Sequence, residues 1–324
     1  MRRKEKLEPD VKDRMLLYLL DVDGRMNHSQ LAKKTQMSKP LVKDRIERLE
    51  KEGFIKGYYT MIDTSKLSFT TFRVYLKFRN LTPEEKKEII NYLKQQGKIG
   101  AVVLLAGKWD AALVIAVKDI YDFYTIWDKL LEDNLESIFD YKISIYSPIY
   151  HYSKGYLIDK KNWSRVRVLG GNEKTDFDER DIKILVNLSK NARISLSDLS
   201  EKLKYSPESI SYRIKQLEKR GIIQGYRAMI DVHRLGYEFY KTEIRLSSYK
   251  NIQKVLAFCH THPNIYQVDK TIGGETLEIE FHVKNLKDML RIIEDFEKEF
   301  PKLIERFDYL TILSEEKITY MPEI

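Results

Sequence analysis

The sequence predicts an α+β protein in which a small helical domain ending in a strand alternates with a βαββαβ domain, twice over. An ungapped overlay of Asp13–Leu67 on Asp181–Leu235, at a constant offset of 168, matches 21 of 55 positions. Within each repeat the spacing of apolar residues changes from the helical period to the alternation typical of strands. A repeat of this length is a pair of domains and not a solenoid unit.

Charge and composition restrict the class of protein. The 324 residues carry a net charge of +8, and the positive excess lies in residues 1–63 and 151–231, whereas residues 232–324 carry an excess of acid. Basic charge confined to particular domains indicates a polyanionic partner. The single cysteine, Cys259, excludes an intrachain disulfide framework and a Cys-rich zinc site. The longest apolar runs are too short to cross a bilayer, and no signal-peptide core follows the basic start at residues 1–4, so we expect a cytoplasmic protein.

Each repeat begins with three predicted helices and a strand. In the first copy, helices are predicted at residues 11–20, from Asn27 or Ser29, and from Ser38. Ser38 and its counterpart Ser206 are suited to cap the third helix, and glycines at positions 53 and 221 to end it. The apolar stretches at 54–62 and 222–230 predict a short strand or wing after each third helix.

Two short helices joined by a tight turn, the second with a polar flank, form a helix-turn-helix, whose second helix enters the major groove of DNA. We expect double-stranded DNA as the partner, with Lys56 and Arg227 on the strands reaching phosphates. The candidate DNA contacts are Ser38, Lys39, Lys43, Asp44, Arg45, Arg48 and Lys56 in the first copy, and Ser206, Ser209, Ser211, Tyr212, Arg213, Lys215 and Arg227 in the second. The alternative is a three-helix module with a solvated charged face that contacts protein.

The second domain of each repeat reads as a ferredoxin-like βαββαβ unit. In the first copy, strands are predicted at 71–78, 99–106, 111–117 and 139–146, with helices capped by Thr82 and Asp119. The predicted domains are residues 1–63 and 178–231 (winged helix-turn-helix), 64–150 and 232–324 (ferredoxin-like), and 151–177 (a basic linker). The pair Gly170-Gly171 indicates flexibility. The linker cations could lie along DNA or along a neighbouring acidic domain, and we favour a simple solvated linker.

The combined motifs resemble the Lrp/AsnC family. The resemblance is carried by residues 45–50 (RIERLE), 53–58 (GFIKGY) and 61–63 (MID), and by residues 213–218 (RIKQLE) and 221–226 (GIIQGY). It implies a DNA-binding head followed by a ferredoxin-like domain of the RAM type, which pairs with a second copy and binds small effectors, often amino acids. Self-association through these domains is therefore expected, within one chain or between chains.

The same resemblance points to a candidate effector site. The turn at residues 107–110 is similar to the family's Gly-x-x-Asp hairpin, but the second copy reads Gly-Gly-Glu-Thr and lacks the acidic position. The candidate effector contacts are Gly107, Trp109 and Asp110, and Gly273 and Gly274. The alternative for both turns is a hairpin that requires glycine at positive φ.

The sequence therefore predicts a sequence-specific DNA-binding regulator that acts as a covalent pseudo-dimer, with no cofactor or metal. The two third helices differ at exposed positions, so we expect an asymmetric target, with half-sites roughly 34 Å or a multiple apart. Glu208 makes the second head the weaker expected phosphate binder. The alternatives are a DNA-architectural protein and an enzyme similar to siroheme decarboxylases. His233–Tyr237 echo the latter, but the predicted second strands supply almost no cations for a polycarboxylate macrocycle.

Overall fold

The computed structural model describes residues 8–160, 164–171 and 173–322; the basic start at residues 1–4 lies outside them. Each half begins with a helical head, and the predicted serine caps and helix-ending glycines are confirmed. The first head comprises α1 (Val11–Val22), α2 (His28–Thr35), α3 (Lys39–Lys51) and β1 (Ile55–Ile62). The second comprises α6 (Glu179–Lys190), α7 (Leu196–Leu203), α8 (Pro207–Lys219) and β7 (Ile223–Ile230).

Each head is followed by a βαββαβ domain, which confirms the predicted fold class. The first has β2 (Thr70–Phe78), α4 (Pro83–Gln95), β3 (Ile99–Gly107), β4 (Ala111–Val117), α5 (Ile120–Asn134) and β5 (Ile138–His151). The second has β8 (Glu238–Leu246), α9 (Ile252–Thr261), β9 (Ile265–Ile272), β10 (Leu277–Val283), α10 (Leu286–Glu299) and β11 (Ile304–Ile318). The capping box at Thr82 and the cap at Asp119 form as the sequence predicts.

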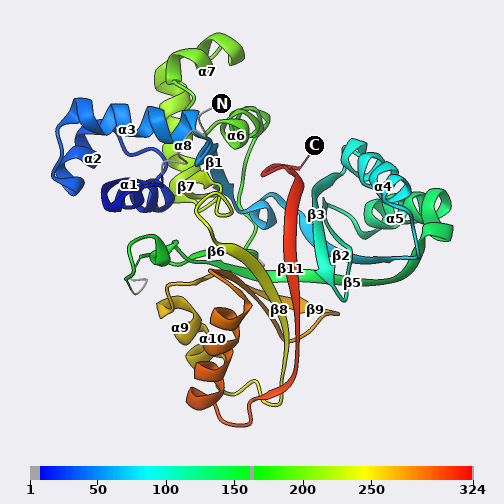
Figure 1. Ribbon diagram of the computed structural model, residues 1–324. Helices are drawn as coiled ribbons and strands as arrows, with labels where there is room; N and C mark the ends of the chain where they lie inside the picture. The colour runs from blue at the N-terminus through cyan, green and yellow to red at the C-terminus, as the bar shows by residue number, and fades with distance from the viewer. Residues whose placement is uncertain (1–7, 161–163, 172, 323–324) are drawn as a thin grey trace, which may run out of the picture.

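The two ferredoxin-like domains join into one closed barrel. Their strands run in the order β2-β4-β3-β11-β8-β10-β9-β5, and the additional pairing of β2 with β5 closes the circle. Helices α4 and α5 cover the outside of the first half, and α9 and α10 cover the outside of the second (Figure 1). The strand faces that carry no helices therefore point toward the barrel interior, where a separate cluster forms around Tyr75, Trp109 and Phe239.

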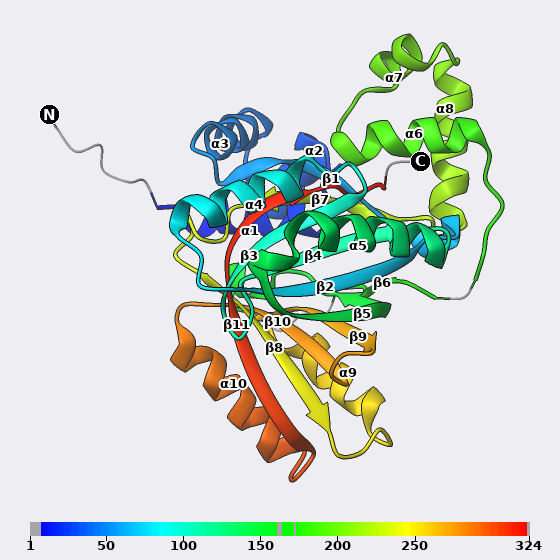
Figure 2. The same ribbon diagram turned by 90° about the vertical axis from the view of Figure 1, so that its right-hand side faces the viewer.

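The strands predicted as wings pair with each other across the two heads. β1 and β7 form an antiparallel two-stranded sheet, which lies at one end of the barrel with a head on either flank (Figure 2). The contacts between the heads are reciprocal. The amide of Gly24 donates to the Tyr226 carbonyl at 2.8 Å, and the equivalent amide of Ala192 donates to the Tyr58 carbonyl at 2.9 Å. Such reciprocity is the property of an isologous interface, here formed within one chain.

One buried ion cluster breaks this symmetry. Asp21 on α1 pairs with Arg227 on β7 at 2.6 Å and with Lys154 at 3.0 Å, and neither Asp21 nor Arg227 is exposed to solvent. Burial alone would raise the pKa of Asp21, but the charges of Arg227 and Lys154 outweigh it and hold that pKa well below its usual range. At the equivalent positions the chain has Ser189 and Tyr59, which cannot form such an ion pair with each other.

The segment between the two halves is not the simple solvated linker that we expected. Residues 152–157 are buried, and Lys154 belongs to the ion cluster. A short strand, β6 (Arg167–Leu169), pairs with the end of β5, and Arg167 donates to the Gln224 carbonyl of the second head. The expectation failed because this segment supplies apolar and charged groups to the junction of heads and barrel. Lys161, one of the linker cations, lies outside the described residues.

Replacing Asp21 with Asn tests the ion cluster. We expect Asp21→Asn to lower the free energy of unfolding by about 3–5 kcal/mol, because Arg227 and Lys154 remain buried without their counter-charge. Chemical denaturation at neutral pH measures this loss. Because folding lowers the pKa of Asp21, its contribution is complete above the ordinary carboxyl range and is lost only as the pH falls through the lowered value. The matched change Ser189→Ala should cost about 1 kcal/mol or less; equal losses would contradict the assignment.

Candidate nucleic-acid interface and effector site

The third helix of each head presents a polar flank to solvent. Ser38 accepts from the Leu41 amide, and Ser206 from the Ser209 amide, so both helices begin at a capped turn. Each helix buries three apolar side chains against its own head: Val42, Ile46 and Leu49 in α3, and Ile210, Ile214 and Leu217 in α8. Most residues that are expected to contact DNA lie on the opposite flank and are exposed to solvent: Ser38, Lys39, Lys43, Asp44, Ser206, Tyr212 and Lys215. Ser209 and Ser211 on the same flank are half-buried.

The arginines expected to contact DNA form ion pairs within their own head. They hold in place α3 and α8, the recognition helices, which are the helices expected to enter the major groove. Arg45 pairs with Asp13 at 2.8 Å and with Asp10, and Arg48 also pairs with Asp13. In the second head Arg213 pairs with Asp181 at 2.8 Å and with Asp178. These arginines connect the third helix to the start of the first helix, so they position the polar flank.

Two cations on the wing strands, Lys56 and Arg227, are expected from the sequence to reach DNA phosphates, and the structure excludes this contact for Arg227. Arg227 is fully buried in the ion pair with Asp21, so the prediction that it contacts DNA is wrong. β7 pairs with β1 and its residue 227 faces the inside of that junction, which the pattern of a lone strand does not reveal. Lys56 remains 55% exposed, although its amine pairs with Asp231 at 2.9 Å.

Sequence reasoning missed an exposed apolar residue on the recognition helix. Leu41 is 42% exposed beside the polar residues of α3, and Tyr212 is 64% exposed on α8. Apolar contacts with thymine methyl groups are one means of reading bases in the major groove. The signal was available, because Leu41 lies outside the buried stripe formed by Val42, Ile46 and Leu49.

The two hairpins expected to bind an effector form tight turns at the tips of their strands. Gly107 and Gly273 adopt φ values of 125° and 86°, which glycine alone adopts readily. Asp110 accepts from the Phe78 amide at 2.9 Å, and in the second copy the Thr276 hydroxyl accepts from the equivalent Leu246 amide at 3.1 Å. The acid missing from the second hairpin is thus replaced in its backbone role by a hydroxyl.

The expected effector residues do not lie around the cavity of the barrel. Trp109 is buried inside the barrel, where its indole stacks on Tyr75 with ring centroids 5.9 Å apart. Gly274 lies against Ser144 and Thr271. None of the five candidates lines the barrel cavity that has Arg73 and Lys241 in its wall. These cations come from β2 and β8, the first strands of the two domains, and not from the second strands considered for an enzyme.

The chain has two paired helix-turn-helix heads, each ending in a strand, on a barrel of two ferredoxin-like domains. This arrangement defines a winged helix-turn-helix DNA-binding protein. The family model described as "Winged helix-turn-helix DNA-binding" matches residues 9–56 and 177–224, once in each head. An uncharacterised HTH-type transcriptional regulator of Pyrococcus furiosus is 32% identical over 143 residues, which cover 43% of this chain and 92% of that regulator. The regulator LrpC of Bacillus subtilis is 28% identical over 123 residues, or 37% of this chain and 81% of LrpC. The chain belongs to the Lrp/AsnC family and carries its head and ferredoxin-like domain in tandem.

Two solved structures of one enzyme resemble the chain along nearly its whole length. The siroheme decarboxylase NirDL covers 96% of this chain and 94% of its own, with a TM-score of 0.62 and 13% sequence identity. At that identity the likeness shows a common fold. Within the part of the chain that the model describes, no helix is long and apolar enough to span a membrane.

The two heads differ in the number of arginines that pair with the buried aspartate on the first helix. Asp13 pairs with Arg45 and Arg48, whereas Asp181 pairs with Arg213. We expect Arg213→Met to lower the free energy of unfolding by about 1–3 kcal/mol, because Asp181 is left without its arginine. Arg45→Met should cost less, since Arg48 still pairs with Asp13, whereas the position equivalent to Arg48 is a glutamine. Urea unfolding of the two variants measures the difference. A greater loss in Arg45→Met would contradict this account.

Proposed function

We propose that the protein is a cytoplasmic, sequence-specific transcriptional regulator whose single chain supplies the two DNA-binding heads of a dimer. The observation that carries this proposal is the reciprocal junction of the heads through β1 and β7, with the polar flanks of α3 and α8 exposed. The junction fixes the spacing between the recognition helices before DNA is met. The relatives from Pyrococcus furiosus and Bacillus subtilis are named as transcriptional regulators, which supports the same function.

The target is proposed to be asymmetric. The exposed flank of α3 carries Lys39, Lys43 and Asp44, whereas α8 carries Ser211, Tyr212 and Lys215 at its polar face. Different side chains read different base edges, so the two half-sites should differ in sequence. The recognition helix of the second head carries Glu208 in its first turn, and this negative charge weakens the attraction of that head for phosphate.

Single substitutions in each head test the proposal. We expect Lys43→Ala and Lys215→Ala to weaken binding to DNA selected from a random pool, and each to reduce the salt slope by about 1 if the amine contacts a phosphate. The loss of DNA affinity should be greater for Lys43→Ala, because Glu208 makes the second head the weaker phosphate binder. Titrations over a series of salt concentrations measure affinity and slope together, and footprinting shows which half-site is weakened.

Lys129→Ala is the matched control, because Lys129 is 61% exposed on α5, in the barrel layer, and its removal changes the net charge equally. If all three variants bind DNA alike, the heads do not contact it as proposed. A long footprint without sequence preference would favour an architectural protein over a regulator.

A second candidate function is a reaction on siroheme, favoured by the likeness of the whole chain to NirDL. The cavity lined by Arg73 and Lys241 measures about 270 Å³, and it adjoins a second cavity of about 410 Å³ that shares Tyr59 and Glu315 with it. Each by itself lies below or near the lower end of the roughly 300–1,000 Å³ usual for ligand pockets and is small for such a macrocycle. We therefore expect no change in the visible spectrum when siroheme is mixed with the purified protein. A stoichiometric spectral shift followed by loss of carbon dioxide would favour the enzyme.

A further inference from the structure

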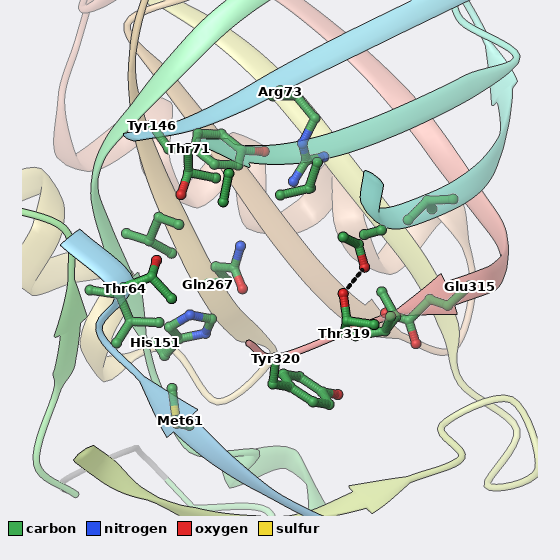
Figure 3. A pocket seen from close by; sticks show the side chains of 18 of the residues that line it. Met61, Thr64, Thr71, Arg73, Tyr146, His151, Gln267, Glu315, Thr319 and Tyr320 are labelled. Atoms are coloured by element: carbon green, nitrogen blue, oxygen red, sulfur yellow. Dashed lines mark hydrogen bonds between the residues drawn. The ribbon is translucent and has the colours of Figure 1, made fainter. Parts of the chain in front are cut away.

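The barrel encloses a cavity at the end that faces the heads. Its volume is about 270 Å³, and most of the surface that lines it is apolar. The wall includes Met61 of β1, so part of it comes from the junction of the heads (Figure 3). Since water occupies about 30 Å³ per molecule, the cavity has room for a small organic molecule.

A buried cation that forms no direct ion pair points into this cavity. Arg73 on β2 is 8% exposed, and its guanidinium group lies over the ring of Tyr146 and projects into the open space (Figure 3). Among the described residues, Arg73 forms no ion pair and its Nε has no hydrogen-bond partner. A buried charge that lacks hydrogen bonds is costly, and an arginine stays protonated in proteins.

The equivalent position in the second half shows how such a charge is otherwise satisfied. Lys241 lies 168 residues after Arg73 and is also buried. Its amine pairs with Asp269 at 2.7 Å and with Glu278 and Glu280 at 2.9 Å. The barrel therefore places three carboxylates directly on Lys241, whereas two of them, Glu278 and Asp269, act on Arg73 only through a longer-range charge interaction and leave its guanidinium facing the cavity.

We propose that the cavity binds a small organic carboxylate with an apolar body, held by the guanidinium of Arg73. A guanidinium group matches the planar geometry of a carboxylate and binds it through two parallel hydrogen bonds. The apolar wall covers the remainder of such a ligand. The site differs from the hairpins at Gly107 and Gly273, which do not line the cavity.

Two acidic side chains in the wall shape the choice of ligand. Glu280 and Glu315 both line the cavity, and burial raises the pKa of each above its ordinary value. Glu280 pairs with Lys241 at 2.9 Å and forms no direct ion pair with Arg73, although the charges of both cations lower its pKa against the effect of burial. Glu315 lies on β11 in another part of the wall (Figure 3). A carboxylate at Arg73 is therefore not opposed by an acid within ion-pair distance of that arginine among the described residues.

An occupant would touch the element that joins the heads. Tyr59 on β1 lines the cavity, stacks on Tyr320 with ring centroids 4.0 Å apart, and lies opposite Arg227 in the β1–β7 register. A ligand that contacts these rings in the folded arrangement stabilises the β1–β7 junction, and with it the spacing of the heads that this junction fixes. This regulatory consequence rests on the proposed function, whereas the binding itself does not.

Thermal unfolding and calorimetry of the full chain with phenylacetate and 4-methylpentanoate test the proposal. We expect at least one of these carboxylates to raise the Tm of the wild type, because binding to the folded state alone stabilises it. Phenylacetamide, which has the same shape without the charge, should produce no rise. Arg73→Met should abolish the shift, measured against the variant's own Tm without ligand. That Tm is expected to lie below the wild-type value, because the surrounding groups, the charges of Glu278 and Asp269 among them, outweigh burial, raise the pKa of Arg73 and so stabilise its charged form in the fold.

Arg245→Met is the matched control, because Arg245 lies on a barrel strand outside the cavity and pairs with Glu275. It should keep the carboxylate shift of the wild type. The proposal is overturned if neither carboxylate stabilises the wild type, if phenylacetamide is as effective, or if Arg73→Met retains the shift. Affinity of the ligand-free wild type for DNA tests the regulator separately, so either proposal can fail while the other stands.

Discussion

The antiparallel pairing of β1 with β7 is the constraint on which the rest of the structure depends. A two-stranded sheet alone is marginally stable in water, and here α1 packs against β7 while α6 packs against β1. Apolar side chains from both heads consequently form a single core. Each head completes the other, so the orientation of α3 relative to α8 is set by folding. The barrel below is closed in the same manner, by strands of one half pairing with strands of the other.

Within this nearly twofold frame, the halves have diverged where the environment is most demanding. The first head is anchored by the buried pair of Asp21 and Arg227, for which the second head has Ser189 and Tyr59. Inside the barrel, Lys241 is surrounded by carboxylates and Arg73 is not. A buried charge without a counter-charge lowers the stability of the fold strongly, so each buried charge restricts which residues can surround it. Both differences therefore distinguish the halves more sharply than surface substitutions do.

Local signals in the sequence predicted most of the fold. Serine caps, the Thr82 capping box, the glycines that end helices and the alternation of the strands place nearly every element. What they could not supply was the partner of each strand. The stretch Phe72-Arg73-Val74-Tyr75 alternates like a strand with one wet face, but closure of the barrel turns that face inward. For the same reason Arg227 resembled a solvent-facing cation on a wing, and the pairing of β7 with β1 buries it.

Carrying both heads on one polypeptide has a consequence for how the proposed regulator would respond to its own abundance. A two-chain assembly must first associate, so occupancy of its site rises with roughly the square of concentration when monomers predominate. Here the second head is always within reach of the first, at an effective concentration fixed by the fold. Occupancy of the DNA site should then follow a simple binding hyperbola even at very low protein concentration. A few molecules per cell would therefore suffice for a graded response.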